Sequence, residues 1–491
     1  MKSRIMRGIF PLTLLCLGPL LPAEAQSTLG TLYNFTALSG ASSTNTDGAV
    51  PTGGLVLSGS TVYGTALVGG GLGQGTVFAV NVNGTGFTNL HDFTGGNDGA
   101  QPFSGLVLSG NILYGTTREG GIASNGELFA LNTDGSDFTN IYSFSATTFN
   151  PINFTSTNTD GAAPQGDLIV SGSTLYGTAY GGGLFGQGTV FALNTNGTGF
   201  TNLHNFASVF GGSGTNREGA TPFAALILAD GRLYGTTYHG GSSGKGSMFA
   251  VNTNGTDFTN LHNFAGGAND GANPEAGLVL VSNILYGTAS FGGPGGYGTV
   301  FAINTNGTGF TNLHYFSALS HGTNSDGANP KSALLVSGNT LYGTATGGGV
   351  DGDGTVFSIN LDGTGFTTVY NFSALDPINF KTNSDGSTPF GSLILSGSTF
   401  YGTAQSGGGS GDGTVFALGL GGPPPLLAIA LADTHALISW PTSASGYVLQ
   451  TAADLTSETW SNITSGIGIA GTNFVFTNLV NNPAAFFRLK Q

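Results

Sequence analysis

Cysteine and positively charged residues are scarce in this 491-residue sequence. It contains one cysteine, 11 lysine and arginine residues, and 25 aspartate and glutamate residues, which give a formal net charge of −14. A single thiol excludes a disulfide framework within the chain, so packing and hydrogen bonds must hold the fold. The scarcity of cations argues against nucleic acid or an anionic membrane as a partner, because both attract clustered positive charge.

Long apolar runs and helical periodicity are missing after the first 25 residues. Residues 1–25 have the pattern of a secretory signal peptide, in which three basic residues precede an apolar stretch and a small-x-small cleavage site ends at Ala25. The apolar stretch, residues 9–21, is too short to span a bilayer. We therefore expect an exported protein, secreted or on the cell surface, with the periplasm as an alternative. We expect it to be a monomer with no transmembrane segment after cleavage.

Glycine, by contrast, is abundant, with 87 residues that lack the three-residue period of collagen. The glycines belong to a repeated unit with Tyr-Gly-Thr at its centre. Each unit begins with Asp-Gly-Ala-x-Pro and an apolar run, and continues after Tyr-Gly-Thr with a Gly-rich bridge, Gly-Thr-Val-Phe-Ala-x-Asn and Phe-Thr-Asn-Leu-His-x-Phe. The seven tripeptides start at Tyr63, Tyr114, Tyr176, Tyr234, Tyr286, Tyr342 and Tyr401.

Each unit contains four short runs rich in Val, Leu, Phe, Tyr and Thr. In the third unit these runs cover residues 167–170, 174–178, 188–193 and 199–206. Such lengths between Gly, Ser and Asn residues indicate strands, and Ser-Gly and Asn-Gly pairs between them indicate tight hairpin turns. The sequence therefore predicts seven four-stranded antiparallel meanders, which are typical of propeller blades.

The two ends of the array predict a closed ring. The last unit stops at residues 414–420 without its fourth strand, whereas the array opens with Thr31-Leu32-Tyr33-Asn34-Phe35, which matches that strand. If the N-terminal strand completes the last blade, no edge is left exposed. We expect an all-β fold with a closed seven-bladed β-propeller over residues 28–420; an open superhelix of repeats is the alternative.

The order of motifs in the repeat is similar to that of a known family. Leu-Tyr-Gly-Thr, Gly-Gly-Gly, Gly-Thr-Val-Phe-Ala-x-Asn and Gly-Phe-Thr in succession resemble the GloVer tandem repeat of exported bacterial choice-of-anchor proteins, and more distantly the kelch blade. The resemblance implies export and implies no reaction.

A different pattern begins after the Gly/Pro linker at residues 421–425. Residues 426–491 contain both tryptophans and no Tyr-Gly-Thr, and their runs predict a small all-β, sandwich-like module. The module resembles the short fibronectin-type-III-like tails of secreted bacterial proteins. The resemblance rests on Ile438-Ser439-Trp440-Pro441, Gly446-Tyr447-Val448-Leu449-Gln450 and Phe486-Phe487-Arg488-Leu489.

Two repeated positions could suggest metal sites, but both favour structural roles. One position in the fourth strand holds His91, His204, His262 and His314, or Tyr33, Tyr142 and Tyr370. Because histidine alternates with tyrosine there, we interpret it as packing rather than a metal-ligand set. The acidic position holds Asp47, Asp98, Asp160, Glu218, Asp270, Asp326 and Asp385. It lacks the further carboxylates of a Ca²⁺ loop, so we expect turn capping and no cofactor, with Ca²⁺ as the alternative.

The long, variable loops of such blades all emerge on one face, where binding is usually located. The residues that depart from the repeat there are Arg118, Glu119, Tyr180, Phe185, Tyr238, His239, Phe291, Tyr297, Asp351 and Asp353. Aromatic and polar side chains around a pore mouth suit a saccharide or a protein segment, and ordinary surface variation is the alternative.

Two functions remain open from the sequence. A non-catalytic binding or scaffold propeller is favoured by the near-uniform repeats. A carbohydrate hydrolase or lyase would need two carboxylates that converge on one site. The acidic residues in the bridges and their flanks are Glu119, Glu127, Asp351, Asp353 and Asp412, and nothing in the sequence pairs them.

Overall fold

The computed structural model describes residues 27–151, 154–209, 214–378 and 381–419, together with 428–432, 435–441, 448–452, 461–471, 473–479 and 486–490. The predicted signal peptide (1–25) and linker (421–425) lie outside these residues. The chain divides into two compact units, one formed by Leu29–Gly419 and the other containing Leu420–Gln491. Every regular element in the described residues is a β-strand, which confirms the all-β prediction. Among them there is no helix with the length and apolar character of a membrane span.

The first unit contains seven sheets of four or five strands, which we number 1 to 7 in chain order. Sheet 1 contains β2 (Val56–Ser58), β3 (Thr61–Ala66), β4 (Thr76–Asn81) and β5 (Thr88–Asp92). Sheet 2 contains β6 (Val107–Ser109), β7 (Ile112–Thr117), β8 (Glu127–Asn132) and β9 (Thr139–Ser143). Sheet 3 contains β12 (Ile169–Ser171), β13 (Thr174–Ala179), β14 (Thr189–Asn194) and β15 (Thr201–Asn205).

Sheet 4 contains β16 (Ile227–Ala229), β17 (Arg232–Thr237), β18 (Ser247–Asn252) and β19 (Thr259–Asn263). Sheet 5 contains β21 (Val279–Val281), β22 (Ile284–Ala289), β24 (Thr299–Asn304) and β25 (Thr311–Tyr315). Sheet 6 contains β27 (Leu335–Ser337), β28 (Thr340–Gly347), β29 (Thr355–Asn360) and β30 (Thr367–Asn371), and β26 (Ala328–Pro330) also pairs with β28.

Sheet 7 contains β32 (Ile394–Ser396), β33 (Thr399–Ser406) and β34 (Thr414–Gly419), with β31 (Ser387–Pro389) on β33 and β1 (Thr28–Asn34) on β34. Two small pairs lie in the loops, β10 (Thr148–Asn150) with β11 (Thr155–Thr157), and β20 (Gly271–Ala272) with β23 (Phe291–Gly292).

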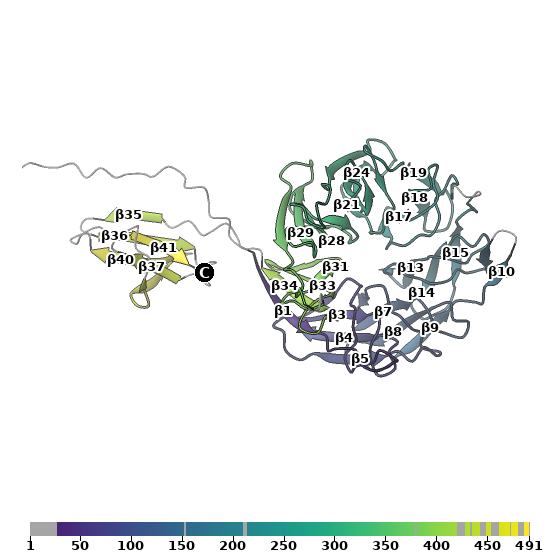
Figure 1. Ribbon diagram of the computed structural model, residues 1–491, viewed down its shortest axis with the longest axis horizontal. Helices are drawn as coiled ribbons and strands as arrows, with labels where there is room; N and C mark the ends of the chain where they lie inside the picture. The colour runs from purple at the N-terminus through teal and green to yellow at the C-terminus, as the bar shows by residue number, and fades with distance from the viewer. Residues whose placement is uncertain are drawn as a thin grey trace, which may run out of the picture. The chain divides into compact units, whose positions relative to one another are not determined.

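The seven sheets follow one another in chain order around a common centre (Figure 1). β1, from the N-terminal end of the unit, pairs with β34, from its C-terminal end. Phe35 and Tyr401 of this last sheet share one core cluster with Val62 of sheet 1. The Thr403 hydroxyl also donates to the Gly53 carbonyl at 3.2 Å. Sheets 1 and 7 are therefore direct neighbours.

The Tyr-Gly-Thr motif serves contacts within and between sheets. A Cβ on Gly64 would lie 2.7 Å from Phe78 Cζ and 2.8 Å from Leu55 Cδ2, so only glycine lets these side chains pack over the strand. The Thr65 hydroxyl donates to the Ser104 carbonyl of the next sheet at 2.7 Å. Equivalent bonds join Thr116 to Pro164, Thr178 to Ala224, Thr236 to Ala276, Thr288 to Ser332 and Thr403 to Gly53.

The acidic residue of each repeat binds the tyrosine or histidine in the fourth strand of the preceding sheet. Asp160, for example, accepts hydrogen bonds from the Tyr142 hydroxyl at 2.8 Å, the Ser145 amide at 2.9 Å and the Ser145 hydroxyl. We call each such pair an outer latch. The seven pairs, at 2.7 to 3.3 Å, are Tyr33–Asp47, His91–Asp98, Tyr142–Asp160, His204–Glu218, His262–Asp270, His314–Asp326 and Tyr370–Asp385.

The latch differs from the turn cap expected of these acidic residues. In five of the seven repeats an asparagine makes the cap, as when Asn45 Nδ2 donates to the Gly48 carbonyl at 2.7 Å and the Gly48 amide donates to Asn45 Oδ1 at 3.0 Å. The carboxylate thus remains available to the hydroxyl, ring and amide donors of the neighbouring sheet. In the fifth repeat Asp270 itself accepts a hydrogen bond from the Gly271 amide at 2.8 Å, as expected. The packing expected of the histidines is present, since the His91 ring stacks on Phe138 of the following sheet with centroids 3.7 Å apart.

The second unit contains two small sheets in its described residues. One has the order β35 (Ala428–Ala432), β36 (His435–Pro441), β40 (Asn473–Leu479) and β39 (Ile467–Ala470). The other has the order β38 (Ser461–Asn462), β37 (Val448–Ala452) and β41 (Phe486–Lys490). Ile438 and Trp440 of the first sheet and Leu449 of the second form a shared core. Trp460, named in the sequence analysis as one of two tryptophans, lies outside the described residues.

Candidate binding site

Two positions of the repeat supply the side chains that line the candidate site. The post-proline slot, which directly follows the proline of Asp-Gly-Ala-x-Pro, holds Thr52, Phe103, Gln165, Phe223, Glu275, Lys331 and Phe390. The strand-end slot, two residues after Tyr-Gly-Thr, holds Leu67, Arg118, Tyr180, Tyr238, Ser290, Thr346 and Gln405. The post-proline slot changes residue type from each sheet to the next, and the strand-end slot does so except for tyrosine in both sheet 3 and sheet 4.

An unusual backbone conformation introduces every post-proline slot. The residue before each of the seven prolines has a φ between 53° and 60°, although none is glycine: Val50, Gln101, Ala163, Thr221, Asn273, Asn329 and Thr388. This left-handed region is costly for β-branched residues such as Val50 and Thr221. The amide of each pre-proline residue is fixed by the preceding sheet, as when Thr221 donates to the Gln187 carbonyl at 2.8 Å. The chain therefore changes direction at the same position in every repeat, so that each post-proline side chain points toward the centre of the seven sheets.

Seven of these slot side chains surround a cavity of about 320 Å³, which we call the cup. They come from sheets 2 to 6 and are Arg118, Gln165, Tyr180, Phe223, Tyr238, Glu275 and Lys331. The volume falls in the range of small-molecule sites. Phe223 lies between the two tyrosines, with ring centroids 6.2 Å from Tyr180 and 6.4 Å from Tyr238, so one wall of the cup is aromatic.

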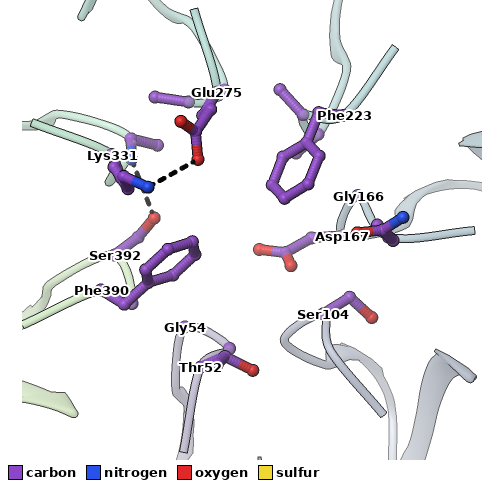
Figure 2. A pocket seen from close by; sticks show the side chains of 18 of the residues that line it. Thr52, Gly54, Ser104, Gly166, Asp167, Phe223, Glu275, Lys331, Phe390 and Ser392 are labelled. Atoms are coloured by element: carbon purple, nitrogen blue, oxygen red, sulfur yellow. Dashed lines mark hydrogen bonds and ion pairs between the residues drawn. The ribbon is translucent and has the colours of Figure 1, made fainter. Parts of the chain in front are cut away.

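A second, smaller cavity of about 60 Å³ shares Gln165, Phe223, Glu275 and Lys331 with the cup and extends to Asp167. Figure 2 shows Asp167, Glu275 and Phe223 pointing into this space from the segments that precede the first strands of three different sheets. Asp167 Oδ1 accepts a hydrogen bond from the Gly105 amide at 2.6 Å, and burial raises the pKa of this carboxyl.

Three phenylalanines cluster at the same level of the ring. Phe103 contacts Phe223 and Phe390 edge-on, with centroids 5.4 Å and 5.5 Å apart. Because they come from sheets 2, 4 and 7, these rings reach across the centre and narrow it.

The charged groups of the cup are arranged around one buried ion pair. Lys331 Nζ lies 3.3 Å from Glu275 Oε2, with side chains that are 25% and 7% exposed. Lys331 Nζ also lies 5.5 Å from the centroid of the Phe390 ring, a cation–π contact. Burial raises the pKa of Tyr238, and the charge of Glu275 adds to this shift. Arg118 pairs with Glu119 at 3.4 Å in a more exposed position.

Three of the sequence-predicted site residues meet in the cup: Arg118, Tyr180 and Tyr238. Glu119 binds Arg118 and accepts a hydrogen bond from Gln101 at 3.1 Å, and the ring of His239 lies edge-on to Tyr238.

The other predicted residues lie elsewhere. Phe185, Phe291 and Asp351 are exposed in their loops, and Tyr297 packs on the core cluster of sheets 5 and 6. Asp353 Oδ2 accepts a hydrogen bond from the Leu375 amide at 3.1 Å.

Sequence reasoning missed four residues of the cup: Gln165, Phe223, Glu275 and Lys331. All four occupy the post-proline slot. The available signal was the change of residue type at this slot within an otherwise uniform repeat.

Glu127, one of the acidic residues considered for catalysis, has a structural role. It is fully buried in sheet 2, and its Oε2 accepts hydrogen bonds from the Ser143 hydroxyl at 2.7 Å and from Asn140. Burial raises its pKa, and these bonds partly oppose the shift. Asp412 likewise accepts a hydrogen bond from the Leu38 amide at 3.1 Å. No three His, Cys, Asp or Glu side chains of the described residues come together as a metal site would require.

Comparisons with known proteins give one family match. The Gloeobacter/Verrucomicrobia repeat matches residues 22–152, 146–324 and 269–423. No curated protein matches the chain. Among solved structures, an oligogalacturonate lyase in complex with manganese is 10% identical with a TM-score of 0.45, over 80% of this chain and 96% of that one. A gluconolactonase from Xanthomonas campestris is 14% identical with a TM-score of 0.36, over 64% and 85%. A chain of a nidogen/laminin complex is 15% identical with a TM-score of 0.36, over 60% and 89%.

Proposed function

This chain belongs to the Gloeobacter/Verrucomicrobia repeat family, and we propose that it is an exported, non-catalytic β-propeller that binds a saccharide in the cup. The match confirms the repeat resemblance seen in the sequence. One observation carries the proposal: the slots that break the repeat converge on a single concave site with an aromatic wall and a few polar groups. This combination is typical of binding sites on rigid repeat scaffolds.

The proposal treats the first unit as a closed propeller of seven blades that is similar to kelch propellers. The pairing of β1 with β34 supports closure, as does the shared core of sheets 7 and 1. The Val50 amide donates to the Asp412 carbonyl at 2.8 Å. This bond between sheets 7 and 1 is equivalent to the bond from each other pre-proline amide to its preceding sheet. A closed ring would hold the cup rigid, because each wall residue is then fixed by two neighbouring sheets.

Binding is favoured over catalysis by the carboxylates of the cup and of the smaller cavity beside it. Glycoside hydrolysis requires two carboxyl groups at one bond. Glu275 is the one carboxylate among the side chains that line the cup, and it is already paired with Lys331. Asp167 lines only the smaller cavity, where its carboxylate accepts a hydrogen bond from the Gly105 amide at 2.6 Å. The aromatic wall, in contrast, suits the apolar face of a pyranose ring.

The proposal also keeps the export and tail assignments made from the sequence. Residues 1–25 would be removed as a signal peptide, and residues 426–491 would form a fibronectin-type-III-like module. Mass spectrometry of the secreted protein should find an N-terminus that begins after Ala25. An N-terminus at Met1 would contradict export by this route.

The function is tested by screening the full chain against glycans and peptides. We expect glycan binding that falls about tenfold or more when Tyr180 and Tyr238 are both replaced by alanine, because each ring supplies stacking area. Tyr315→Ala is the matched control, since this tyrosine is exposed on β25 and lies outside the cup. Peptide binding alone would make the ligand a protein segment. Turnover of a glycan, abolished by Glu275→Gln, would make the protein an enzyme.

A further inference from the structure

The charge of the cup is opposite to that of the ring around it. Residues 29–419 contain six lysines and arginines and 21 aspartates and glutamates. Two of the six cations, Arg118 and Lys331, line the cup with a single carboxylate, Glu275. Residues 29–419, which are strongly acidic, therefore place a third of their lysines and arginines around one cavity of about 320 Å³.

Both cations can accept an anionic partner. The exposed side chains of Arg118 and Glu119, at 40% and 46% exposure, form a pair of the kind that contributes little to stability, so another carboxylate can replace Glu119 at small cost. Lys331 has three N–H donors, and Glu275 needs one of them. Because Lys331 also neutralises Glu275, this carboxylate does not cancel the attraction of Arg118 for an anion.

The aromatic wall limits the anion to one that carries an apolar ring face. Phe223 stands between Tyr180 and Tyr238, and Gln165 adds an amide that can bind hydroxyl groups. A pyranose ring packs on such a wall, and a carboxylate on the ring can reach a guanidinium, which binds carboxylates through two parallel hydrogen bonds.

We infer that the cup binds an acidic saccharide that contains uronic acid, with its sugar ring on Tyr180, Phe223 and Tyr238 and its carboxylate directed to Arg118 and Lys331. This inference rests on the proposed function and adds the class of ligand.

The test compares uronate tetrasaccharides with their methyl esters, which keep the sugar ring and remove the charge. Tetramers of mannuronate, galacturonate and glucuronate are titrated into the full chain by calorimetry at low and high salt. We expect at least one tetramer to bind about tenfold more tightly than its ester at low salt, the size of a charge-assisted hydrogen bond. Added salt should reduce this ratio, because it screens the exposed Arg118.

Variants locate the charge preference. Arg118→Gln should remove most of the preference for the acid, because it weakens binding of the acid far more than binding of the ester. Arg217→Gln is the matched control, because it removes the same charge from an exposed arginine outside the cup. The double variant Lys331→Gln with Glu275→Gln removes the second cation without leaving a buried carboxylate unpaired.

The outcomes separate this inference from the proposed function. If acid and ester bind equally and Tyr238→Ala weakens both, the acidic class is wrong and saccharide binding stands. If only neutral glycans bind, the acidic class is likewise wrong. If no saccharide binds, both proposals are wrong. If Arg217→Gln removes the preference as strongly as Arg118→Gln does, the acid is attracted by the general surface charge and the cup assignment is wrong.

Discussion

Along the fourth strands of the seven sheets one contact recurs, an acidic residue bound by a tyrosine or histidine. Around the cup, no two neighbouring sheets present the same side chain in the post-proline slot. Each outer latch joins the fourth strand of one sheet to the loop that leads into the next sheet. Because these surroundings are the same in every repeat, the same pair of residue types is required each time. The seven slot residues that line the cup border a cavity instead of a repeated partner. Their residue types can therefore differ more freely than those of the latch, which allows a repeated scaffold to build an asymmetric site.

Breaking a latch should give the largest loss of stability. Asp160 is 5% exposed and holds Tyr142 and Ser145 by three hydrogen bonds. Asp160→Ala removes the shared acceptor of the partly buried Tyr142 hydroxyl and of both Ser145 donors, and should lower the free energy of unfolding by about 3 kcal/mol. Urea denaturation of the full chain measures the change.

The cup provides the contrast for this experiment. Asp160→Asn keeps one acceptor oxygen and should lose less than Asp160→Ala. Tyr238→Ala, in the cup, should leave the unfolding midpoint nearly unchanged. An equal loss from Asp160→Ala and Tyr238→Ala would contradict the division between a structural latch and a variable cup.

The sequence predicted the strands of the repeat better than the variable residues of the cup. Alternating residues and turn pairs located β13 at 174–178, within one residue of its observed end at Ala179. The first strand of the same sheet was expected at 167–170 but begins at Ile169, because Asp167 turns its carboxylate toward Gly105 at the centre. Strand patterns follow from local spacing, whereas this turn depends on a neighbouring sheet.

The cup was predictable only in part, for a related reason. Arg118, Tyr180 and Tyr238 stood out because they depart from the repeat in the bridges that follow Tyr-Gly-Thr. Glu275 and Lys331 follow a proline in the approach to the innermost strand, where a side chain can face the core or the centre. The positive φ before each proline decides this direction, and single-sequence patterns do not reveal it.

A paired substitution in sheet 2 tests whether a buried residue pair of one sheet can be replaced by the equivalent pair of another sheet. Glu127 and Ser143 lie opposite each other where sheet 3 has Thr189 and Asn205. Glu127→Thr alone removes the acceptor of the Ser143 hydroxyl and one of the acceptors of Asn140, and should cost about 1–2 kcal/mol. Adding Ser143→Asn recreates the pair of sheet 3 and should recover most of the loss in urea denaturation. Additive losses in the double variant would show that the two positions do not compensate each other.

The histidine latches should make stability depend on pH in mild acid. Burial lowers the pKa of His91 and His204 below the ordinary value of 6.5, and their acidic partners only partly oppose this. As the pH falls through 6.5, these histidines take up protons in the unfolded chain before they do so in the folded chain. The free energy of unfolding therefore decreases as the pH falls.

Tyrosine substitutions separate this effect from general acid denaturation. His91→Tyr with His204→Tyr copies the latches of Tyr33 and Tyr142 and should lose less thermal stability between pH 7 and pH 5 than the unchanged protein. Above pH 10 the order reverses, because burial and the paired aspartate raise the pKa of a latch tyrosine and its ionisation favours the unfolded chain. The same acid-side slope in both proteins would exclude the histidines as its source.

The smallest change in stability is expected at Thr344, a Tyr-Gly-Thr threonine that lacks, in the described part of the chain, the hydrogen bond to the next sheet. Thr65 donates to the Ser104 carbonyl at 2.7 Å, whereas the buried Thr344 hydroxyl has no hydrogen-bond partner among the described residues. Thr65→Val should cost about 1 kcal/mol, because it removes a bond and leaves a buried carbonyl short of a donor. Thr344→Val removes a buried hydroxyl that has nothing to bind and should leave the unfolding midpoint unchanged or raise it slightly. Since both substitutions keep the shape of the side chain, their difference measures the bond between neighbouring sheets. Equal losses of unfolding free energy in the two variants would mean that the threonine side chain stabilises the contact between neighbouring sheets through packing and not through its hydrogen bond.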